Sequence, residues 1–346
     1  MSKIHQWAVI GAGPAGLASV GILIDSGVDA SDIVMFDPCF DSGALGSSWG
    51  EVSSNTSVKH FLDFFYQIKS FDFESCPHQY LIHGMQEESR CLLKHVAEPL
   101  SWVSRRLLQK VDHFKTRIES LEALNGCWQL SDGSRCYQAR QVILAMGSKP
   151  KSLCYKGVKE IKLKTALTPQ DLLHVATKDD SVAVFGSSHS SMIIVKNLID
   201  CGVKAVINFY LRPFRYAINM GDWTLYDNTG LKGETADWVR QNISGYSHPD
   251  ITRFISSPEN IKRYLPQCNK AVYAIGFDRN RIAIPGIDID EYDPSNGIIA
   301  PGLFGVGIGF PLRSVDPLGN SEFNVGMFKF MRDIKKVMPL WLKYGL

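Results

Sequence analysis

The sequence predicts an α/β protein with two three-layer units, each built around a parallel sheet. Two stretches carry this prediction: WAVIGAGPAG, from Trp7 to Gly16, and SVAVFGSSHSS, from Ser181 to Ser191. In both, an apolar strand runs into a glycine turn and then into a helix pattern, which is the order of a parallel βαβ unit. With 346 residues, the chain is long enough for two such units.

The composition is that of a globular protein without a strongly charged surface. Hydrophobic residues make up 45% of the chain, charged residues make up 21%, and the formal net charge is +2. This balance gives no reason to expect nucleic acid as a partner. No apolar run reaches the roughly 18 residues of a transmembrane segment. The first strand begins so early that we expect no signal peptide.

Eight cysteines are scattered along the chain, without a C-x-x-C pair and without a cysteine–histidine cluster. The sequence therefore predicts no metal site and no redox disulfide. Scattered thiols without a secretory signal are usually reduced, so we expect a cytoplasmic location.

The first unit opens with Gly11, Gly13 and Gly16 in G-x-G-x-x-G spacing. Gly11 permits a tight turn, Gly13 lets a pyrophosphate approach the backbone, and Gly16 lets the helix pack close to the strand. The N-terminus of that helix offers N–H groups and a positive dipole end to phosphates. The next strand, 33–36, ends at Asp37, where an acid accepts the ribose hydroxyls of a dinucleotide.

The segments after this unit alternate between loop and helix. Residues 38–60 are rich in glycine and serine, which predicts a loop. Trp49 and Asn55 are its most specific side chains, and they are either pocket residues or a packed tryptophan and a turn asparagine. Residues 61–85 are rich in aromatic side chains and predict core or a pocket wall, and 88–110 follow a helical pattern.

Residues 111–144 predict strands joined by tight turns, because Asn125–Gly126 and Asp132–Gly133 favour hairpins. A buried strand then stops at Gly147. Residues 151–180 are lysine-rich and irregular, which predicts a linker between the two units.

The second unit keeps only Gly186 of the three turn glycines, and Ser188 and Ser191 replace the other two. Serine is small and its hydroxyl can donate to a phosphate, so a nucleotide site can persist. The following strand leads to Arg212, with Arg215 nearby, at the place where the first unit has an acid. An arginine there accommodates a 2′-phosphate and favours NADP over NAD.

The remaining segments complete the two units. Residues 213–265 predict an insertion that lines a substrate entrance or covers the second unit. A strand within 271–280 stops at Gly276. Residues 297–311 predict a short strand that breaks into glycines, and a helix over 324–337 closes the chain.

These motifs resemble those of the flavoproteins with two dinucleotide-binding domains, which include thioredoxin reductases, flavin-containing monooxygenases and amino-acid N-hydroxylases. GAGPAG, VILAMGSKP, FGSSHSS, YAIGFDRN and GLFGVGIG occur in that superfamily's order and span nearly the whole chain. Met146 stands where the superfamily's crossing segment usually carries threonine. The resemblance implies two Rossmann-like domains, an FAD domain formed by 1–160 and 270–346 and an inserted NADP domain formed by 161–269.

The resemblance also implies which residues hold each cofactor. The FAD contacts would come from Gly11, Gly13, Pro14, Ala15, Gly16, Asp37, Pro38, Trp49, Ala145, Met146, Gly147, Gly305, Gly307 and Asn324. The NADPH contacts would come from Gly186, Ser187, Ser188, His189, Ser190, Arg212 and Gly276. Trp49 and Asn55 would shape the flavin's face, and they are the candidate catalytic residues. The last helix would direct its N-terminal dipole at the flavin.

The missing cysteine pair argues against a disulfide reductase. We therefore predict an NADPH-dependent, FAD-containing monooxygenase of small molecules, in which the cofactors carry out the redox chemistry and the protein supplies orientation. Two alternatives stay open: an NAD(P)H-dependent flavin reductase or oxidase, and a non-enzymatic redox-responsive flavoprotein. The sequence also leaves open the substrate and the oligomeric state, a homodimer included.

Overall fold

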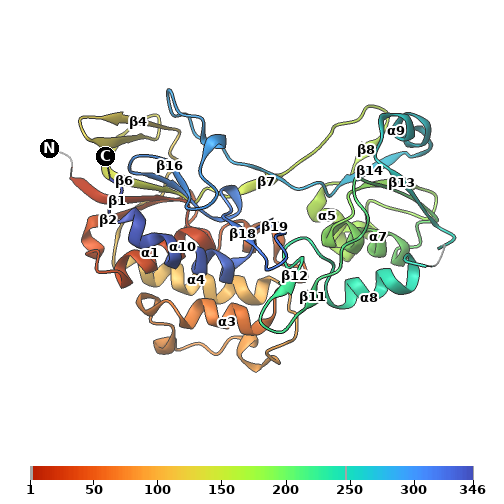
Figure 1. The fold of residues 1–346 in the computed structure, drawn as a ribbon, viewed down its shortest axis with the longest axis horizontal. Helices are drawn as coiled ribbons and strands as arrows, with labels where there is room; N and C mark the ends of the chain where they lie inside the picture. Colours follow the sequence, from red (N-terminus) through yellow and green to blue (C-terminus); the bar gives the residue numbers. More distant parts are fainter. Residues whose placement is uncertain (1–2, 246–247, 346) are drawn as a thin grey trace. The chain divides into compact units, whose positions relative to one another are not determined.

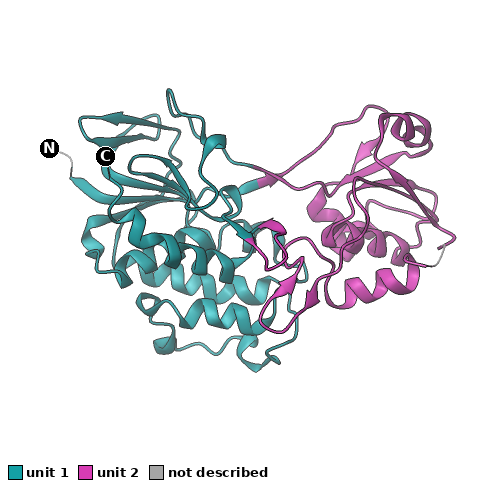
Figure 2. Cartoon of the chain, viewed as in Figure 1, with its two compact units in different colours: residues 1–148, 279–314, 323–346 teal, residues 149–278, 315–322 magenta. Residues whose placement is uncertain are grey.

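The computed structural model describes residues 3–245 and 248–345, and Figure 1 labels its elements in chain order. The chain divides into two compact units (Figure 2). Unit 1 comprises residues 1–148, 279–314 and 323–346, and unit 2 comprises residues 149–278 and 315–322. The boundaries expected from the sequence, after 160 and after 269, both fall within unit 2.

Unit 1 is built on a mainly parallel sheet. Its main row contains, in spatial order, β16 (Ile298–Ala300), β17 (Leu303–Gly305), β6 (Cys136–Leu144), β1 (Ile4–Ile10), β2 (Ile33–Phe36) and β3 (Asp112–Phe114). All neighbours in this row run parallel except β16, which is antiparallel to β17. Every residue of β2 is buried, as expected for a strand that is covered on both faces.

The two faces of this sheet carry different layers. One face packs against helices, which are α1 (Pro14–Asp25), α3 (Val58–Tyr66), α4 (Lys94–Leu108) and α10 (Met327–Trp341) (Figure 1). The other face packs against the antiparallel hairpin of β4 (Ser120–Leu124) and β5 (Cys127–Ser131), which continues into β6. Asn125 and Gly126 both have positive φ in its turn, as the Asn-Gly pair predicts. Unit 1 therefore has the predicted three layers.

The first part of the aromatic segment 61–85 is core, whereas Tyr80 near its end lines a cavity of about 610 Å³ together with α4 residues such as Arg105. The buried rings of the segment, which lie on α3 and in the two short turns that follow, are Phe61, Phe64, Phe65, Phe71 and Phe73. They pack beneath α1, α4 and α10 in a single cluster, so the alternative of a pocket wall is not needed to explain them.

Unit 2 is built on an all-parallel sheet. Its strands, in spatial order, are β13 (Ile251–Ile255), β10 (Ala205–Tyr210), β9 (Ser181–Phe185), β14 (Lys270–Tyr273) and β8 (Lys159–Glu160). Its helices are α5 (Leu163–Leu167), α6 (Pro169–Leu173), α7 (His189–Asp200), α8 (Gly233–Asn242) and α9 (Pro258–Tyr264). Two small hairpins, β11–β12 (Ile218–Asn219 and Thr224–Leu225) and β18–β19 (Arg313–Val315 and Ser321–Phe323), lie outside the sheet.

Three predictions about the segments between these elements were wrong. The predicted loop 38–60 includes α2 (Ala44–Trp49), and the predicted linker 151–180 includes β8, α5 and α6 of unit 2. The predicted insertion 213–265 contributes an edge strand, β13, to the sheet itself. α2, α5 and α6 have only five or six residues, which is fewer than two turns and too short to show a 3.6-residue pattern.

Two short strands mark where the chain passes between the units. β7 (Ser148–Pro150) and β15 (Phe277–Arg279) pair with each other. On the unit 2 side, the Lys151 N–H donates to the Gly276 carbonyl at 3.0 Å. Gly276, a predicted NADP contact, has a positive φ of 96° and belongs to this crossing.

Candidate active site

The first glycine turn has the backbone geometry that its spacing predicts. Gly11 has φ of 106°, and its N–H donates to the Phe36 carbonyl at 2.8 Å. A Cβ on Gly11 would clash with the Ala145 carbonyl oxygen, and one on Gly16 would clash with the Gly11 carbonyl oxygen. Both positions therefore require glycine because the backbone itself fills the space.

Gly13 differs from these two glycines because its side-chain position faces open space. It is the N-cap of α1 with φ of −76°, a Cβ added to it would meet no atom within 4 Å, and no side chain caps this helix end. Pro14 and Ala15 continue the first turn of α1. The turn thus presents an accessible backbone and an uncapped helix N-terminus, which together form an anion-binding arrangement.

Asp37 follows β2 and holds this turn in place. One carboxylate oxygen, Oδ2, accepts the Ala12 N–H at 2.8 Å. The other, Oδ1, accepts the N–H groups of Cys39 and Phe40 at 2.8 and 2.9 Å. The carboxylate therefore fixes the glycine loop against the segment that follows Pro38, in addition to the ribose contact predicted for it.

The crossing segment after β6 lies next to the turn. The Ala145 N–H donates to the Ile10 carbonyl at 2.8 Å. Asn280 then fixes the two following residues: its side-chain amide donates to the Met146 carbonyl at 2.8 Å, and its backbone N–H donates to the Gly147 carbonyl at 3.0 Å. Sequence reasoning missed Asn280, although the motif YAIGFDRN contains it.

The glycines of the segment 305–307 lie next to the first glycine turn. A Cβ on Gly307, where φ is 79°, would lie 2.7 Å from the Ala15 Cβ in the first turn of α1. A Cβ on Gly305 would clash with the Phe310 ring. Unit 1 thus gathers most of the predicted FAD residues, from three distant parts of the chain, around one turn.

Trp49 and Asn55 occupy neighbouring segments after this turn. α2 begins after Gly43, whose added Cβ would lie 2.9 Å from the Gly13 Cα, and it ends at the half-buried Trp49. Asn55 is exposed on the following loop, and its Oδ1 accepts the Thr56 hydroxyl at 3.3 Å. A Cβ on Gly326, the N-cap of α10, would lie 3.8 Å from that same hydroxyl oxygen.

Asn324 precedes the last helix by three residues. The last helix begins at Met327, and Asn324 lies before it and is buried. Its side-chain amide donates to both carboxylate oxygens of Asp333, at 3.0 and 3.1 Å. Burial raises the pKa of Asp333, although the Asn324 hydrogen bonds oppose this shift. The Asn324 side chain thus anchors α10 through Asp333, and its predicted FAD contact stays a prediction.

The second turn repeats the geometry of the first. Gly186 has φ of 125°, and its N–H donates to the Phe209 carbonyl at 2.8 Å. A Cβ on it would clash with the Ala274 carbonyl oxygen, just as one on Gly11 would clash with Ala145. The two turns match because both follow a central parallel strand and face the crossing segment of the neighbouring strand.

The serines of the second turn fit without backbone strain. Ser188 is the N-cap of α7 with φ of −84° and ψ of −179°, close to the −76° and −177° of Gly13. An L-residue adopts these angles freely. Ser191 is fully buried and its hydroxyl donates to the Ser188 carbonyl at 2.7 Å. His189 and Ser190 are the first two residues of α7, so the helix N-terminus stays next to the turn.

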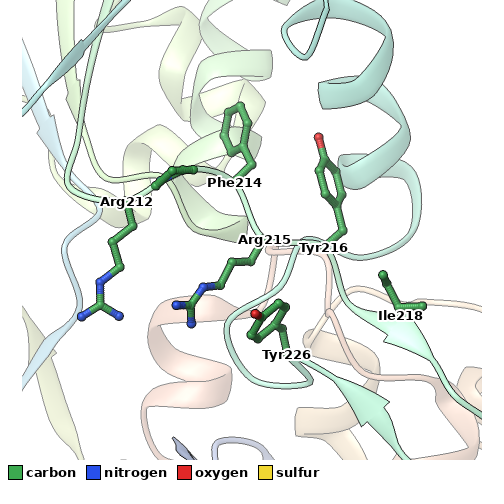
Figure 3. A pocket seen from close by; sticks show the side chains of 7 residues that line it. Arg212, Phe214, Arg215, Tyr216, Ile218 and Tyr226 are labelled. Atoms are coloured by element: carbon green, nitrogen blue, oxygen red, sulfur yellow. The ribbon is translucent and has the colours of Figure 1, made fainter. Parts of the chain in front are cut away.

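Two arginines line a pocket beside this turn. The pocket has a volume of about 410 Å³ and is lined by Arg212, Pro213, Phe214, Arg215, Tyr216, Ile218 and Tyr226 (Figure 3). The Ser187 hydroxyl donates to the Arg212 carbonyl at 3.0 Å, which connects the pocket to the turn. The Arg215 guanidinium lies 4.7 Å from the centre of the Tyr226 ring, and both arginine side chains extend to the same side of their loop (Figure 3).

A third arginine, Arg253, packs against the pocket residue Phe214. Arg253 on β13 lies over the rings of Tyr210 and Phe214, at 4.4 and 3.8 Å from their centres. Its Nε donates to Asn208 at 2.9 Å, and Asn208 in turn donates to the Gly186 carbonyl at 2.7 Å. Burial lowers the pKa of Arg253. The glycine turn and the pocket wall are therefore held by one network.

The described residues offer no group of three or more metal-ligating side chains. Among them we also find no helix with the length and hydropathy that a bilayer crossing requires. All eight cysteines are unpaired.

Comparison with known sequences identifies the family of this chain. A family model described as pyridine nucleotide-disulphide oxidoreductase matches residues 5–217. The monooxygenase AgnR1 from Paecilomyces divaricatus is 30% identical over 96% of this chain and 97% of its own length. The chain belongs to the pyridine nucleotide-disulphide oxidoreductase family. Since the full-length relative is a monooxygenase, the predicted class, an oxidoreductase of the monooxygenase type, is confirmed, and the chain is an enzyme.

Solved structures of low identity share the fold of this oxidoreductase. A flavin-containing monooxygenase from Stenotrophomonas maltophilia aligns over 99% of both chains, with a TM-score of 0.65 and 14% identity. An ornithine N-hydroxylase from Kutzneria sp. 744 aligns over 99% of both chains, with 0.62 and 13%. A thioredoxin reductase from Lactococcus lactis aligns over 98% of both, with 0.60 and 11%. The predicted α/β fold with two Rossmann-like domains is thereby confirmed.

Proposed function

We propose that this oxidoreductase is an FAD-dependent monooxygenase that is reduced by NADPH and acts on a small molecule. The observation that carries the proposal is the repeated turn: Gly11 and Gly186 share their φ range, their hydrogen bond to the neighbouring strand and their close approach to a crossing segment. Two such turns provide for two dinucleotides in one chain. The monooxygenase relative supports this chemistry, and the ornithine N-hydroxylase that shares this fold was solved with reduced FAD and NADP+.

Unit 1 fits FAD. The open space at Gly13 and the uncapped N-terminus of α1 would accept the pyrophosphate, and Asp37 would accept the ribose hydroxyls. When bound, the flavin supplies the hydride and oxygen chemistry. α10 also begins without a side-chain cap, at Gly326, so its dipole would favour negative charge near its first turn. We assign Trp49 and Asn55 to the wall beside this region.

Unit 2 fits NADPH. Ser188 and the first amides of α7 would hold the pyrophosphate, since the serine keeps the backbone angles of Gly13. Arg212 and Arg215 would hold the 2′-phosphate, because a guanidinium binds phosphate through paired N–H donors. The chain's own contribution is thus to bind both dinucleotides and to orient them.

The cysteines argue against the disulfide reductase activity of some members of this family. That activity needs two thiols close enough to form a disulfide, and no two cysteines of this chain are nearer in sequence than the nine positions between Cys127 and Cys136. Those two are not bonded to each other. Because the thiols are unpaired, we also keep the proposal of a cytoplasmic location.

Anaerobic mixing of the FAD-loaded enzyme with NADPH or NADH tests the electron donor. NADPH should bleach the flavin absorbance faster than NADH does. Arg212→Ala should reduce the preference for NADPH by about tenfold or more, the loss expected when a charge-assisted phosphate contact is removed. The matched control is Lys204→Ala, which removes an exposed positive charge next to β10. Equal preference in wild type and Arg212→Ala would contradict the 2′-phosphate assignment.

Adding oxygen to the reduced enzyme tests the reaction class. A monooxygenase transfers one oxygen atom to its substrate, so a panel of amines, sulfides and ketones should contain a compound whose oxidation matches NADPH consumption. Release of peroxide in the same amount as NADPH, with every compound of the panel, would favour the flavin oxidase alternative.

A further inference from the structure

One turn of unit 2 holds a strained residue beside the arginine pocket. Tyr226, which lies under Arg215, has a positive φ of 51°, a conformation that disfavours a bulky side chain. The turn closes with a 2.7 Å hydrogen bond from the Gly230 N–H to the Tyr226 carbonyl. A residue in this conformation persists where other contacts fix it.

The contact that fixes this turn comes from a distant segment of the chain. Glu322 belongs to the β18–β19 hairpin, and its Oε2 accepts the Asn228 N–H at 3.0 Å. Its Oε1 accepts the Thr229 hydroxyl. Both oxygens of one half-buried carboxylate thus bind the two residues at the middle of the turn.

The same turn also fixes the position of the backbone at Arg215. The Leu231 N–H donates to the Arg215 carbonyl at 2.8 Å, and the Ala217 N–H donates to the Leu231 carbonyl at 3.0 Å. Gly230 lies so close that a Cβ on it would clash with the Ala217 nitrogen. A shift of the turn therefore shifts both Tyr226 and the loop segment that contains Arg215.

The base of the hairpin is also fixed, at its unit 1 end. The Asn324 N–H donates to the Leu312 carbonyl at 2.8 Å, and the Ser314 hydroxyl donates to Asn324 Oδ1 at 2.8 Å. The Asn324–Asp333 pair anchors this base to α10. These hydrogen bonds lie within unit 1, at the base of the β18–β19 hairpin.

We propose that Glu322 is a positioning residue for the 2′-phosphate end of the NADPH pocket: by clamping Asn228 and Thr229, it holds Tyr226 and Arg215 in their binding geometry. This inference rests on the proposed function of that pocket. A carboxylate close to a phosphate site would otherwise weaken binding by repulsion, so the sign of its effect on NADPH binding decides between positioning and repulsion.

Two substitutions of Glu322 separate these effects. Glu322→Ala removes both hydrogen bonds, whereas Glu322→Gln removes the charge and keeps a carbonyl for Asn228 and an amide for Thr229. Positioning predicts that Glu322→Ala weakens adenosine 2′,5′-bisphosphate binding to the FAD-loaded enzyme by about tenfold and that Glu322→Gln restores it. The KM for NADPH should rise in parallel, with kcat and the KM for NADH unchanged.

Two further variants control this test. Thr229→Val removes one partner of the clamp, and its effect should not add to that of Glu322→Ala because both break the same contact. Glu259→Ala removes an exposed carboxylate from α9 of the same unit and should change nothing. Thermal melts identify any Glu322 variant that fails to fold, and Thr229→Val, at an exposed position, then carries the test.

The outcomes distinguish a wrong role for Glu322 from a wrong assignment of the pocket. Unchanged or tighter bisphosphate binding in Glu322→Ala, with binding lost in Arg212→Ala, would overturn the role of Glu322 and leave the pocket assignment standing. Equal loss in Glu322→Ala and Glu322→Gln would also overturn it. If Arg212→Ala itself binds the bisphosphate like wild type, the proposed function of the pocket fails and the role of Glu322 fails with it.

Discussion

Gly13 is the residue whose role in this structure depends most on the cofactor. Its φ of −76° suits any L-residue, and an added Cβ meets no protein atom within 4 Å. Gly16 lies in the same turn, yet a Cβ there would clash with the Gly11 carbonyl. The G-x-G-x-x-G spacing thus combines a glycine that the fold requires with one that only a close ligand requires.

This difference predicts that Gly13→Ala folds but binds FAD poorly. The free energy of unfolding of the apoprotein should stay within about 0.5 kcal/mol of wild type, whereas FAD affinity should fall by about tenfold or more because the methyl group occupies the path of the pyrophosphate. Thermal melts of the apoprotein and titration with FAD measure the two effects.

Gly84→Ala is the matched control for this substitution. Gly84 is exposed in unit 1, and an added Cβ there also meets no atom within 4 Å. It should bind FAD like wild type. Wild-type FAD affinity in Gly13→Ala would contradict the placement of the pyrophosphate at this turn.

Single residues also mark the limit of what the sequence could predict. Gly11, Gly16 and Gly186 were predictable because a strand, a turn of small residues and a helix follow one another directly in the sequence around them. Asn280 and Glu322 were not, because their roles depend on contacts with partners 134 and 94 positions away in the chain. Only the fold brings such partners together, and a polar side chain in a loop gives no signal of it.

At the scale of elements, prediction succeeded for long, apolar segments. β2 was predicted with its observed bounds because four consecutive apolar residues precede an acid. α5 and α6 were missed because each has five residues, too few for helical periodicity. Tertiary packing stabilises them instead, through buried side chains such as Leu167 and Leu172.

The start of the β9 and β14 strands depends on one buried acid. Asp180 accepts hydrogen bonds from the Lys270 ammonium at 2.5 Å, the Thr177 N–H at 2.7 Å and the Asn269 side chain at 2.8 Å. Burial raises the pKa of Asp180, but these hydrogen bonds outweigh it and lower the pKa to about 2. The folded state therefore favours the charged carboxylate.

We predict that Asp180→Asn destabilises unit 2 at neutral pH. An acid whose pKa is lowered by folding stabilises the protein above its unfolded pKa, near 4, and this stabilisation is lost as the pH falls toward 2. The substitution should cost about 2 kcal/mol at pH 7 and about half of that near pH 3. Thermal melts at the two pH values measure the difference.

Asp179→Asn is the matched control, because Asp179 is the exposed neighbour of Asp180. It removes the same charge from the same loop without the buried contacts, so its melting temperature should stay close to wild type at both pH values. Equal destabilisation by the two substitutions would assign the effect to net charge rather than to the Lys270 cluster.

At the scale of the whole molecule, the chain order of the units is more complex than the sequence suggested. Unit 2 is formed by 149–278 and also by the short excursion 315–322. The chain therefore passes between the units four times rather than twice. The second pair of passages was not predictable, since residues 315–322 contain no periodic apolar pattern and join unit 2 through hydrogen bonds such as those of Glu322.

The cysteines distinguish this enzyme from the members of its family that reduce disulfides. In this chain Cys39, Cys136 and Cys154 are exposed, and none of the eight cysteines is bonded to another. An enzyme that passes electrons to a disulfide through its own thiols depends on a cysteine pair, whereas a monooxygenase does not. Removal of the accessible thiols therefore separates the two chemistries.

We predict that the triple variant with Cys39, Cys136 and Cys154 replaced by serine oxidises NADPH within about twofold of the wild-type rate, the range expected for surface substitutions. The wild-type enzyme should also fail to reduce a small aromatic disulfide with NADPH, while the Lactococcus lactis type of thioredoxin reductase serves as the positive control. NADPH-driven disulfide reduction that disappears in the triple variant would contradict the monooxygenase assignment, because it would show that exposed thiols accept electrons from the flavin.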